Sequence, residues 1–246
     1  MDVAVRRKAR FFSIWLWAGL LASTFGLTSV QAACGHTRLF VDGSLDERDE
    51  ACRAIEEVLH YFERGELRID PELTIRFQRE VYVDVVNPLT NETSLIRVSG
   101  IYRAGTKELQ MTSSHSPWIS QRRPWGLAWD QEFAHSILQH EIVHAELAQL
   151  MAGSYDKLPR SWHEALAYAV QIDLMPPNLK ARVLEPYRSE EGFVNTLEVN
   201  DTTYELNPDA FAVASYKLYV RKGRLDFLKR VISLQLDTIR MNDFVP

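Results

Sequence analysis

Apolar residues in the second half of the chain recur every three or four positions, the spacing of one buried face on a helix. Flanking residues mark helix ends: Asp130 is a suitable N-cap, Pro208 suits a first helical position, and Gly153 and Pro176 follow helix termini. Residues 130–246 are therefore predicted to be helical. We expect four helices there, at residues 130–151, 161–174, 207–223 and 225–239.

Residues 33–129 show a different pattern, in which apolar and polar residues alternate as they do in half-buried strands. The alternation predicts a short strand at 39–41 and three or four further strands within 73–111, with a turn at 87–91. One helix interrupts them at 46–64, where a glycine follows an apolar stripe. The two halves together predict an α+β fold, in which a small mixed or antiparallel sheet packs on a helix and a helical C-terminal part follows.

The first 32 residues have the three-part layout of a secretory signal peptide. Four basic residues precede an uncharged apolar run at 11–27, and Val30-Gln31-Ala32 would suit a signal peptidase. An uncleaved membrane anchor is the alternative, although this run is at the short edge of the length that spans a bilayer. Cleavage would leave residues 33–246 as one domain, periplasmic or secreted and no longer attached to a membrane.

Charge and cysteine content narrow the possible partners. The whole chain carries a net charge of −5 and its first 32 residues contribute +3, so the remainder carries −8. An acidic surface repels phosphate backbones, which argues against nucleic acid as a partner. Two cysteines are too few for a disulfide scaffold. After export, Cys34 and Cys52 are expected to form one bridge near the new N-terminus, and two unpaired thiols are the alternative.

The residues with the clearest chemical meaning lie in the helix predicted at 130–151. His140-Glu141-Ile142-Val143-His144 places two imidazoles four residues apart, on one face of the helix. Catalytic zinc takes imidazole nitrogen as a ligand and keeps one position open for water. Glu141 lies beside the pair and can take a proton from a metal-bound water. The motif predicts two Zn²⁺ ligands and a general base. A polar helix face that merely holds two histidines is the alternative.

Glu164 is the candidate for a third metal ligand. Ser161 offers the same carboxylate a different role, since the two residues could form a capping box at a helix start. The helix around Glu164 is apolar on almost every side, so a carboxylate buried there is better explained by an ion than by a cap. We therefore predict that His140, His144 and Glu164 hold Zn²⁺ and that Glu141 is catalytic.

These two motifs together resemble those of the gluzincins, the thermolysin-like zinc metallopeptidases, over about residues 109–223. Around the third ligand the chain reads Trp162-His163-Glu164-Ala165-Leu166-Ala167-Tyr168, with Ala165 where the family often has glycine and Tyr168 one place early. The resemblance implies a zincin-like fold, the ligands and base named above, and a peptide substrate paired with the strand near Leu109-Gln110-Met111. Some relatives place an aspartate at the position of Tyr168 to orient the first histidine, so the partner of His140 is left open.

Hydrolysis of a peptide also needs a donor for the negative oxygen that develops on the attacked carbonyl. The resemblance favours a residue on a later helix, Tyr216 or Tyr219. His163 is also a candidate for this donor, but it points about 100° away from Glu164 and would be a poor fourth ligand. The full set of candidates is Tyr155, His163, Tyr204, Tyr216 and Tyr219.

The sequence as a whole predicts an exported zinc-dependent metallohydrolase, most simply a peptidase acting on peptide or protein substrates. A non-catalytic periplasmic or secreted binding module that retains a peptidase-like fold is the alternative. Arg122 and Arg123 are interpreted as a solvated loop pair, or as a site for a substrate carboxylate. The histidines at positions 60, 115 and 135 are interpreted as surface or hydrogen-bonded polar residues. The oligomeric state is left open.

Overall fold

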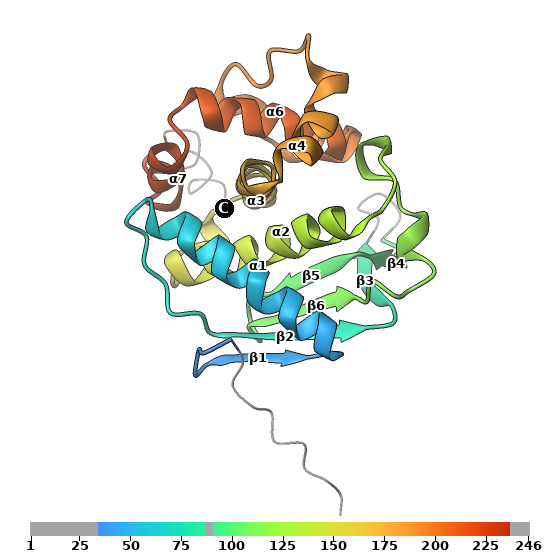
Figure 1. Ribbon diagram of the computed structural model, residues 1–246. Coiled ribbons are helices and arrows are strands. Elements are labelled where there is room, and N and C mark those ends of the chain that lie inside the picture. The colour runs from blue at the N-terminus through green and yellow to red at the C-terminus, as the bar shows by residue number, and fades with distance from the viewer. Residues whose placement is uncertain (1–33, 87–90, 237–246) are drawn as a thin grey trace, which may run out of the picture.

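A computed structural model describes residues 34–86 and 91–236, which form a mixed α+β structure (Figure 1). The predicted signal peptide lies outside these residues, as does most of the predicted turn at 87–91. The strands are Leu39–Asp42 (β1), Leu73–Gln78 (β2), Val81–Val86 (β3), Thr93–Val98 (β4), Gly100–Arg103 (β5) and Glu108–Thr112 (β6). The α-helices are Leu45–Glu63 (α1), Gln131–Leu150 (α2), Arg160–Leu174 (α3), Pro177–Leu184 (α4), Asp201–Leu206 (α5), Pro208–Arg221 (α6) and Leu225–Ile232 (α7).

In the described part of the chain, four strands form a mixed sheet in the order β1-β2-β6-β5. β1, β2 and β6 are parallel, and β5 is antiparallel to β6. Helices α1 and α2 lie on one face of this sheet (Figure 1). Leu73, Ile75 and Leu109 are almost fully buried in the core that the sheet shares with these helices. The predicted mixed sheet packed on a helix is thus confirmed, while β3 and β4 form a separate antiparallel pair.

The strand expected at the edge of the cleft is not β6. Leu109 pairs with Ile75 of β2 on one side and with Tyr102 of β5 on the other, so β6 is internal. A tight turn, in which the backbone N–H of Thr106 donates to the carbonyl of Arg103 at 3.2 Å, adds β5 to the sheet. Among the described strands, β5 therefore takes the edge position beside α2, and the expectation for residues 109–111 is wrong.

Three of the predicted C-terminal helices have close to their expected bounds. The Asp130 carboxylate caps α2 by accepting from the backbone N–H of Phe133 at 2.8 Å, and Asn207 caps α6 in the same way. The fourth helix ends at Ile232 and not at 239, because Leu234 adopts a left-handed backbone (φ 53°) that an α-helix cannot continue through. The sequence pattern also missed α4, which buries only Leu179 and Val183.

The capping box between Ser161 and Glu164, the alternative to a metal ligand, does not form at the start of α3. Pro159 occupies the N-cap, and Ser161 lies inside the helix, 1% exposed. The backbone N–H of Ser161 is instead satisfied by the Asp201 carboxylate from α5, at 2.9 Å. A tertiary contact therefore replaces the local cap, and the side chain of Glu164 is left available for another role.

Two contacts fix α1 beside the N-terminal segment and beside α2. Cys34 and Cys52 form a disulfide, which confirms the expected bridge. The buried His135 of α2 faces two carboxylates of α1, with Nδ1 at 2.5 Å from Glu50 and Nε2 at 2.8 Å from Glu57. His135 is thus a hydrogen-bonded polar residue, as predicted, and it holds together the two helices that cover the sheet.

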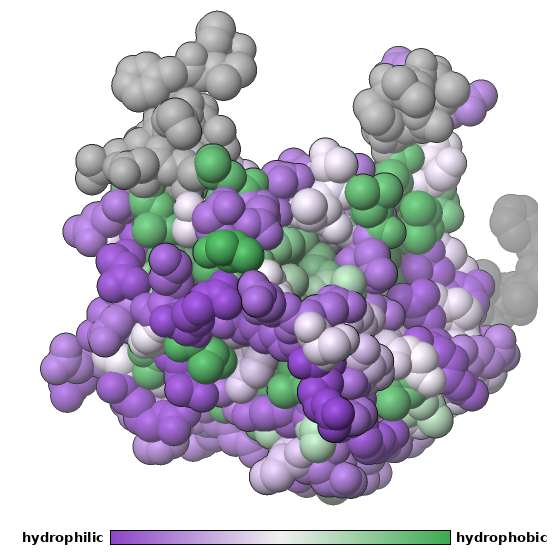
Figure 2. All heavy atoms as spheres, turned by 90° about the horizontal axis from the view of Figure 1, so that it is seen from above, coloured by the Kyte–Doolittle hydropathy of each residue, from purple (hydrophilic) through white to green (hydrophobic). Residues whose placement is uncertain are grey.

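The surface on the side of α6 is predominantly hydrophilic, and its hydrophobic residues lie in several separate groups (Figure 2). None of the helices in the described residues combines the length and apolar character needed to span a bilayer.

Asp173 of α3 connects helices that are distant in sequence. Its carboxylate accepts from the hydroxyl of Tyr61 in α1 at 2.8 Å and from Tyr216 in α6 at 3.3 Å, and Arg224 lies 3.4 Å away. Asp173→Asn is expected to lower the free energy of unfolding by about 2–3 kcal/mol, because bonds to a charged acceptor weaken and donors stay buried. Urea denaturation measures this loss. Asp49→Asn, at an exposed position of α1, should change stability by less than about 0.5 kcal/mol. Equal stabilities of the two variants would contradict this role.

Candidate metal centre

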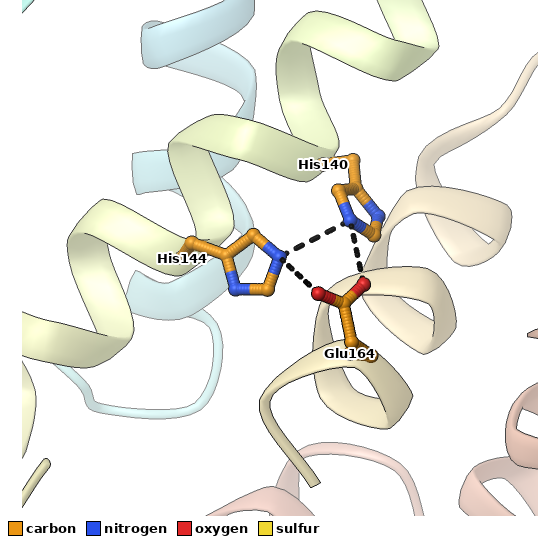
Figure 3. Close-up of side chains that lie close together, drawn as sticks. All are labelled: His140, His144 and Glu164. Atoms are coloured by element: carbon orange, nitrogen blue, oxygen red, sulfur yellow. Dashed lines mark hydrogen bonds and ion pairs between the residues drawn. The ribbon is translucent and has the colours of Figure 1, made fainter. Parts of the chain in front are cut away.

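Helices α2 and α3 bring the three predicted ligands together. His140 and His144 lie one turn apart on α2, and Glu164 projects from the second turn of α3 toward both (Figure 3). The two histidine Nε2 atoms are 3.1 Å apart, and Glu164 oxygens lie 3.5 Å from Nε2 of His140 and 3.8 Å from Nε2 of His144. The histidines are buried, at 6% and 8% exposure, and the glutamate is mostly buried. The three side chains converge on a single point.

This spacing fits a tetrahedral metal ion. Bonds of about 2.0–2.1 Å at tetrahedral angles separate neighbouring ligand atoms by about 3.3 Å. The two Nε2 atoms are 3.1 Å apart, Oε2 of Glu164 lies 3.5 Å from His140 and Oε1 lies 3.8 Å from His144, so one ligand atom from each residue lies within 4.8 Å of the other two, and a small closure would bring them to that spacing. The donors are two imidazole nitrogens and one carboxylate, a set that provides three ligands and leaves a fourth position open. The described residues thus contain a triad that can hold a metal ion.

The hydrogen bonds behind His140 determine which of its nitrogens carries the proton. The Ser136 hydroxyl donates to the carbonyl of Phe133 at 2.8 Å, and its oxygen accepts from Nε2 of Gln171 at 3.3 Å. The amide oxygen of Gln171 therefore faces Nδ1 of His140, at 3.1 Å, and requires a proton there. Nε2 of His140 then presents its lone pair to the centre, as metal binding requires. Sequence reasoning missed Gln171, which lies on α3 seven positions after Glu164.

The electrostatics of the triad favour a cation at its centre. Burial opposes ionisation of Glu164, but the interactions of its carboxyl group with the His140 and His144 rings outweigh this effect and lower its pKa to about 2. Burial lowers the pKa of His144 to about 3, so this imidazole is neutral and has a free lone pair. For His140, burial again opposes the charge, but the Glu164 carboxylate raises its pKa. A buried carboxylate between two imidazoles therefore attracts a positive charge, which a proton or a metal ion can provide.

Glu141 lies beside the triad, between α2 and the edge strand. Burial raises its pKa to about 7, and the backbone N–H of Tyr102 in β5 counteracts part of that shift. A Cβ atom at Gly100 would lie 2.8 Å from Cγ of Glu141, so the close approach of this side chain to β5 depends on glycine. A carboxylate with a pKa near neutrality can both accept and return a proton, which suits a general base.

Tyrosines around the site differ in where their hydroxyls are directed. Tyr216 donates to Asp173 at 3.3 Å, and the hydroxyl of Tyr219 lies 2.6 Å from that of Tyr61, so the two residues favoured by the resemblance belong to a different network. Burial raises the pKa values of Tyr155 and Tyr204, and the charges of Glu164 and Glu141 add to this effect. Tyr155 and Tyr204 are therefore the candidate donors that lie near the triad.

Two further aromatic contacts shape the site. The ring of Tyr168 packs against His140, with centroids 4.4 Å apart, and so fills the position at which an orienting aspartate was considered. His163 stacks on Tyr155 with a centroid distance of 4.0 Å, and its Nε2 lies 3.1 Å from the Tyr155 carbonyl. His163 therefore does not belong to the triad, as its predicted direction on the helix indicates.

Gln171→Ala is expected to weaken zinc binding by about 10–100-fold, the usual cost of removing a partner that orients a metal-bound histidine. Without the amide oxygen, His140 can place its proton on Nε2 and lose its lone pair toward the centre. Competition with a chromophoric chelator measures the affinity. Gln149→Ala, on α2 and outside the triad, is the matched control. An unchanged affinity in Gln171→Ala would contradict the orienting role.

Comparisons with known proteins place the chain in a family without assigning an activity. No curated protein and no solved structure matches it significantly. The model of DUF6639, a family of unknown function, matches residues 41–237, which include the triad, Glu141 and Gln171. Because this match covers most of the sequence, the chain belongs to the DUF6639 family.

Proposed function

We propose that this protein is an exported zinc-dependent metallopeptidase with a zincin-like fold. The observation that carries the proposal is the convergence of His140, His144 and Glu164 at separations suited to tetrahedral zinc, with Glu141 beside them. Three protein ligands and an open position are typical of catalytic zinc, whereas structural zinc has four protein ligands. Imidazole and carboxylate together also suit zinc better than they suit calcium or magnesium.

Each residue of the site has a distinct task in this reaction. Zinc, when bound, supplies a Lewis acid that polarises a carbonyl and lowers the pKa of water. Glu141 accepts the proton of the attacking water and delivers it to the leaving amine. Gln171 keeps Nε2 of His140 free of a proton, as described above. Tyr155 or Tyr204 donates a hydrogen bond to the oxygen that becomes negative.

The position of β5 supports a peptide as the substrate. It is antiparallel to β6, lies at the edge of the sheet among the described strands, and contacts the helix that carries Glu141. An edge strand offers backbone N–H and C=O groups to an extended chain. A peptide paired with β5 would pass next to Glu141. This combination of a mixed sheet, an antiparallel edge strand and a ligand-bearing helix is the basis for the zincin-like assignment.

The compartment is inferred from two features. Residues 1–32 have the layout of a signal peptide, and the Cys34–Cys52 bridge is of a kind that persists in oxidising environments. We therefore place the protein in the periplasm or outside the cell, with peptides or proteins as its partners.

The test combines metal content with chelator-sensitive hydrolysis. Residues 33–246, purified from an oxidising compartment, should contain about one zinc per chain. They should cleave casein or a peptide library, lose activity with a chelator, and regain it when zinc is returned. Zinc binding without any cleavage would instead favour a non-catalytic module that retains this fold. Absence of zinc binding at neutral pH would refute both the metal and the mechanism.

A further inference from the structure

A hollow of about 400 Å³ is lined in part by Glu141. Its walls come from the start of β5, from α2 and α3, from the first turn of α6, and from the loop at residues 122–125. Because Glu141 itself lines the hollow, a group bound there belongs to the part of the substrate next to the attacked bond. The interpretation of the hollow as a substrate-binding site rests on the function proposed above.

The loop that forms one wall of the hollow is held in a defined conformation. Trp125 has a left-handed backbone, with φ 51°, which is unusual for a large side chain. Two hydrogen bonds to Asp209 hold it: the backbone N–H donates to the carboxylate at 2.9 Å, and the indole N–H donates to the carbonyl at 3.0 Å. Arg123 adds bonds to the carbonyls of Ser120 and Arg122. The wall is therefore built by specific contacts between α6 and the loop.

Three charged side chains come from the loop and from α6 where they line the hollow. Two of them have a structural role, and the third does not. Arg123 is bound to loop carbonyls, and the Asp209 carboxylate is bound to the N–H of Trp125. The Arg122 guanidinium lies over the ring of Trp118, 5.4 Å from its centroid, and has no hydrogen-bond acceptor among the described residues. Its N–H donors are thus available to a ligand, and a guanidinium binds carboxylates in a two-pronged geometry.

We propose that this hollow binds a carboxylate of the substrate through Arg122, so that the enzyme prefers peptides with an anionic group on a residue next to the attacked bond. Burial raises the pKa of Asp209, while Arg122 lowers it, so Arg122 is near enough to offset the charge of Asp209, one of the two acidic residues, with Glu141, that line the hollow. The carboxylate can come from an aspartate or glutamate side chain, or from a free C-terminus. Both sources present the same chemistry to Arg122.

The test compares peptides that differ only at this position. With zinc-loaded protein, kcat/KM is expected to be about tenfold higher for glutamate than for glutamine, the scale of one charge-assisted hydrogen bond. Lysine at this position should be disfavoured. Peptides ending at this residue, with a free or an amidated C-terminus, distinguish the terminal carboxylate from the side chain. Arg122→Glu should reverse the preference toward lysine. Arg188→Glu, which changes an exposed residue outside the hollow, should leave the preference unchanged.

A binding measurement separates this inference from the proposed function. Tryptophan fluorescence of the Glu141→Gln variant, with and without zinc, reports binding of the same peptides without hydrolysis, because Trp125 lines the hollow. Selective binding of glutamate peptides that is lost in Arg122→Glu supports the inference even if nothing is cleaved. Cleavage without preference for an anionic group overturns it while the peptidase function stands. Absence of both binding and cleavage overturns the two together.

Discussion

Glu141→Gln is expected to retain zinc and to lower kcat by about 10³-fold, within the usual contribution of a general base. The amide has nearly the same size as the carboxylate, so the packing against Gly100 and the three ligands should be preserved. It cannot accept a proton from water, however, and this is the step assigned to Glu141. Zinc content and steady-state kinetics on a cleaved peptide measure the two properties separately.

Glu132→Gln is the matched control for this variant. It makes the same chemical change in the first turn of α2, outside the site, at an exposed position. Its kcat should equal that of the unmodified protein. If Glu141→Gln kept full activity, Glu141 would not be the general base. If the variant lost its zinc, Glu141 would contribute to metal binding and not to proton transfer.

His144→Ala is expected to weaken zinc binding by more than about 100-fold. Loss of a residue that only orients a ligand costs up to about 100-fold, and loss of the ligand itself should cost more. The side chain supplies one of three ligand atoms, and alanine offers no ligand atom in its place. A competition titration against a chelator of known affinity measures the change. Hydrolysis should fall in proportion to the zinc lost.

His163→Ala provides the control for the loss of an imidazole. His163 neighbours Glu164 in sequence, but it stacks on Tyr155 and lies outside the triad. Zinc affinity should therefore stay within a few-fold of the original value. If His144→Ala and His163→Ala bound zinc equally well, the assignment of the ligands would be wrong.

The parts of the site that could be predicted are those encoded within one helix. His140 and His144 are four residues apart, and α2 follows a clear apolar period with a capping aspartate, so their shared face is a local property. Glu164 could be predicted as the third ligand because its helix is apolar on most sides. Its approach to within 3.5 Å of His140 depends on how α2 packs against α3, which is a tertiary property.

The parts that could not be predicted depend on contacts between distant segments. Gln171 resembles any glutamine in a helix until Ser136 and His140 are seen beside it. β5 has four residues, which include Gly100 and Arg103, and is too short for a readable alternation. The hydroxyls of Tyr216 and Tyr219 point into a network around Asp173 that no spacing rule reveals.

The neutral side chain of Gln171 has a consequence for the reactivity of the proposed enzyme. With two uncharged imidazoles and one carboxylate as ligands, a divalent ion keeps a formal surplus of one positive charge. An aspartate behind His140 would share its negative charge with the ring and reduce that surplus, whereas an amide contributes only a dipole. In the proposed enzyme, glutamine at this position would make a bound zinc ion a stronger electrophile toward a substrate carbonyl, and it would lower the affinity of the site for the ion.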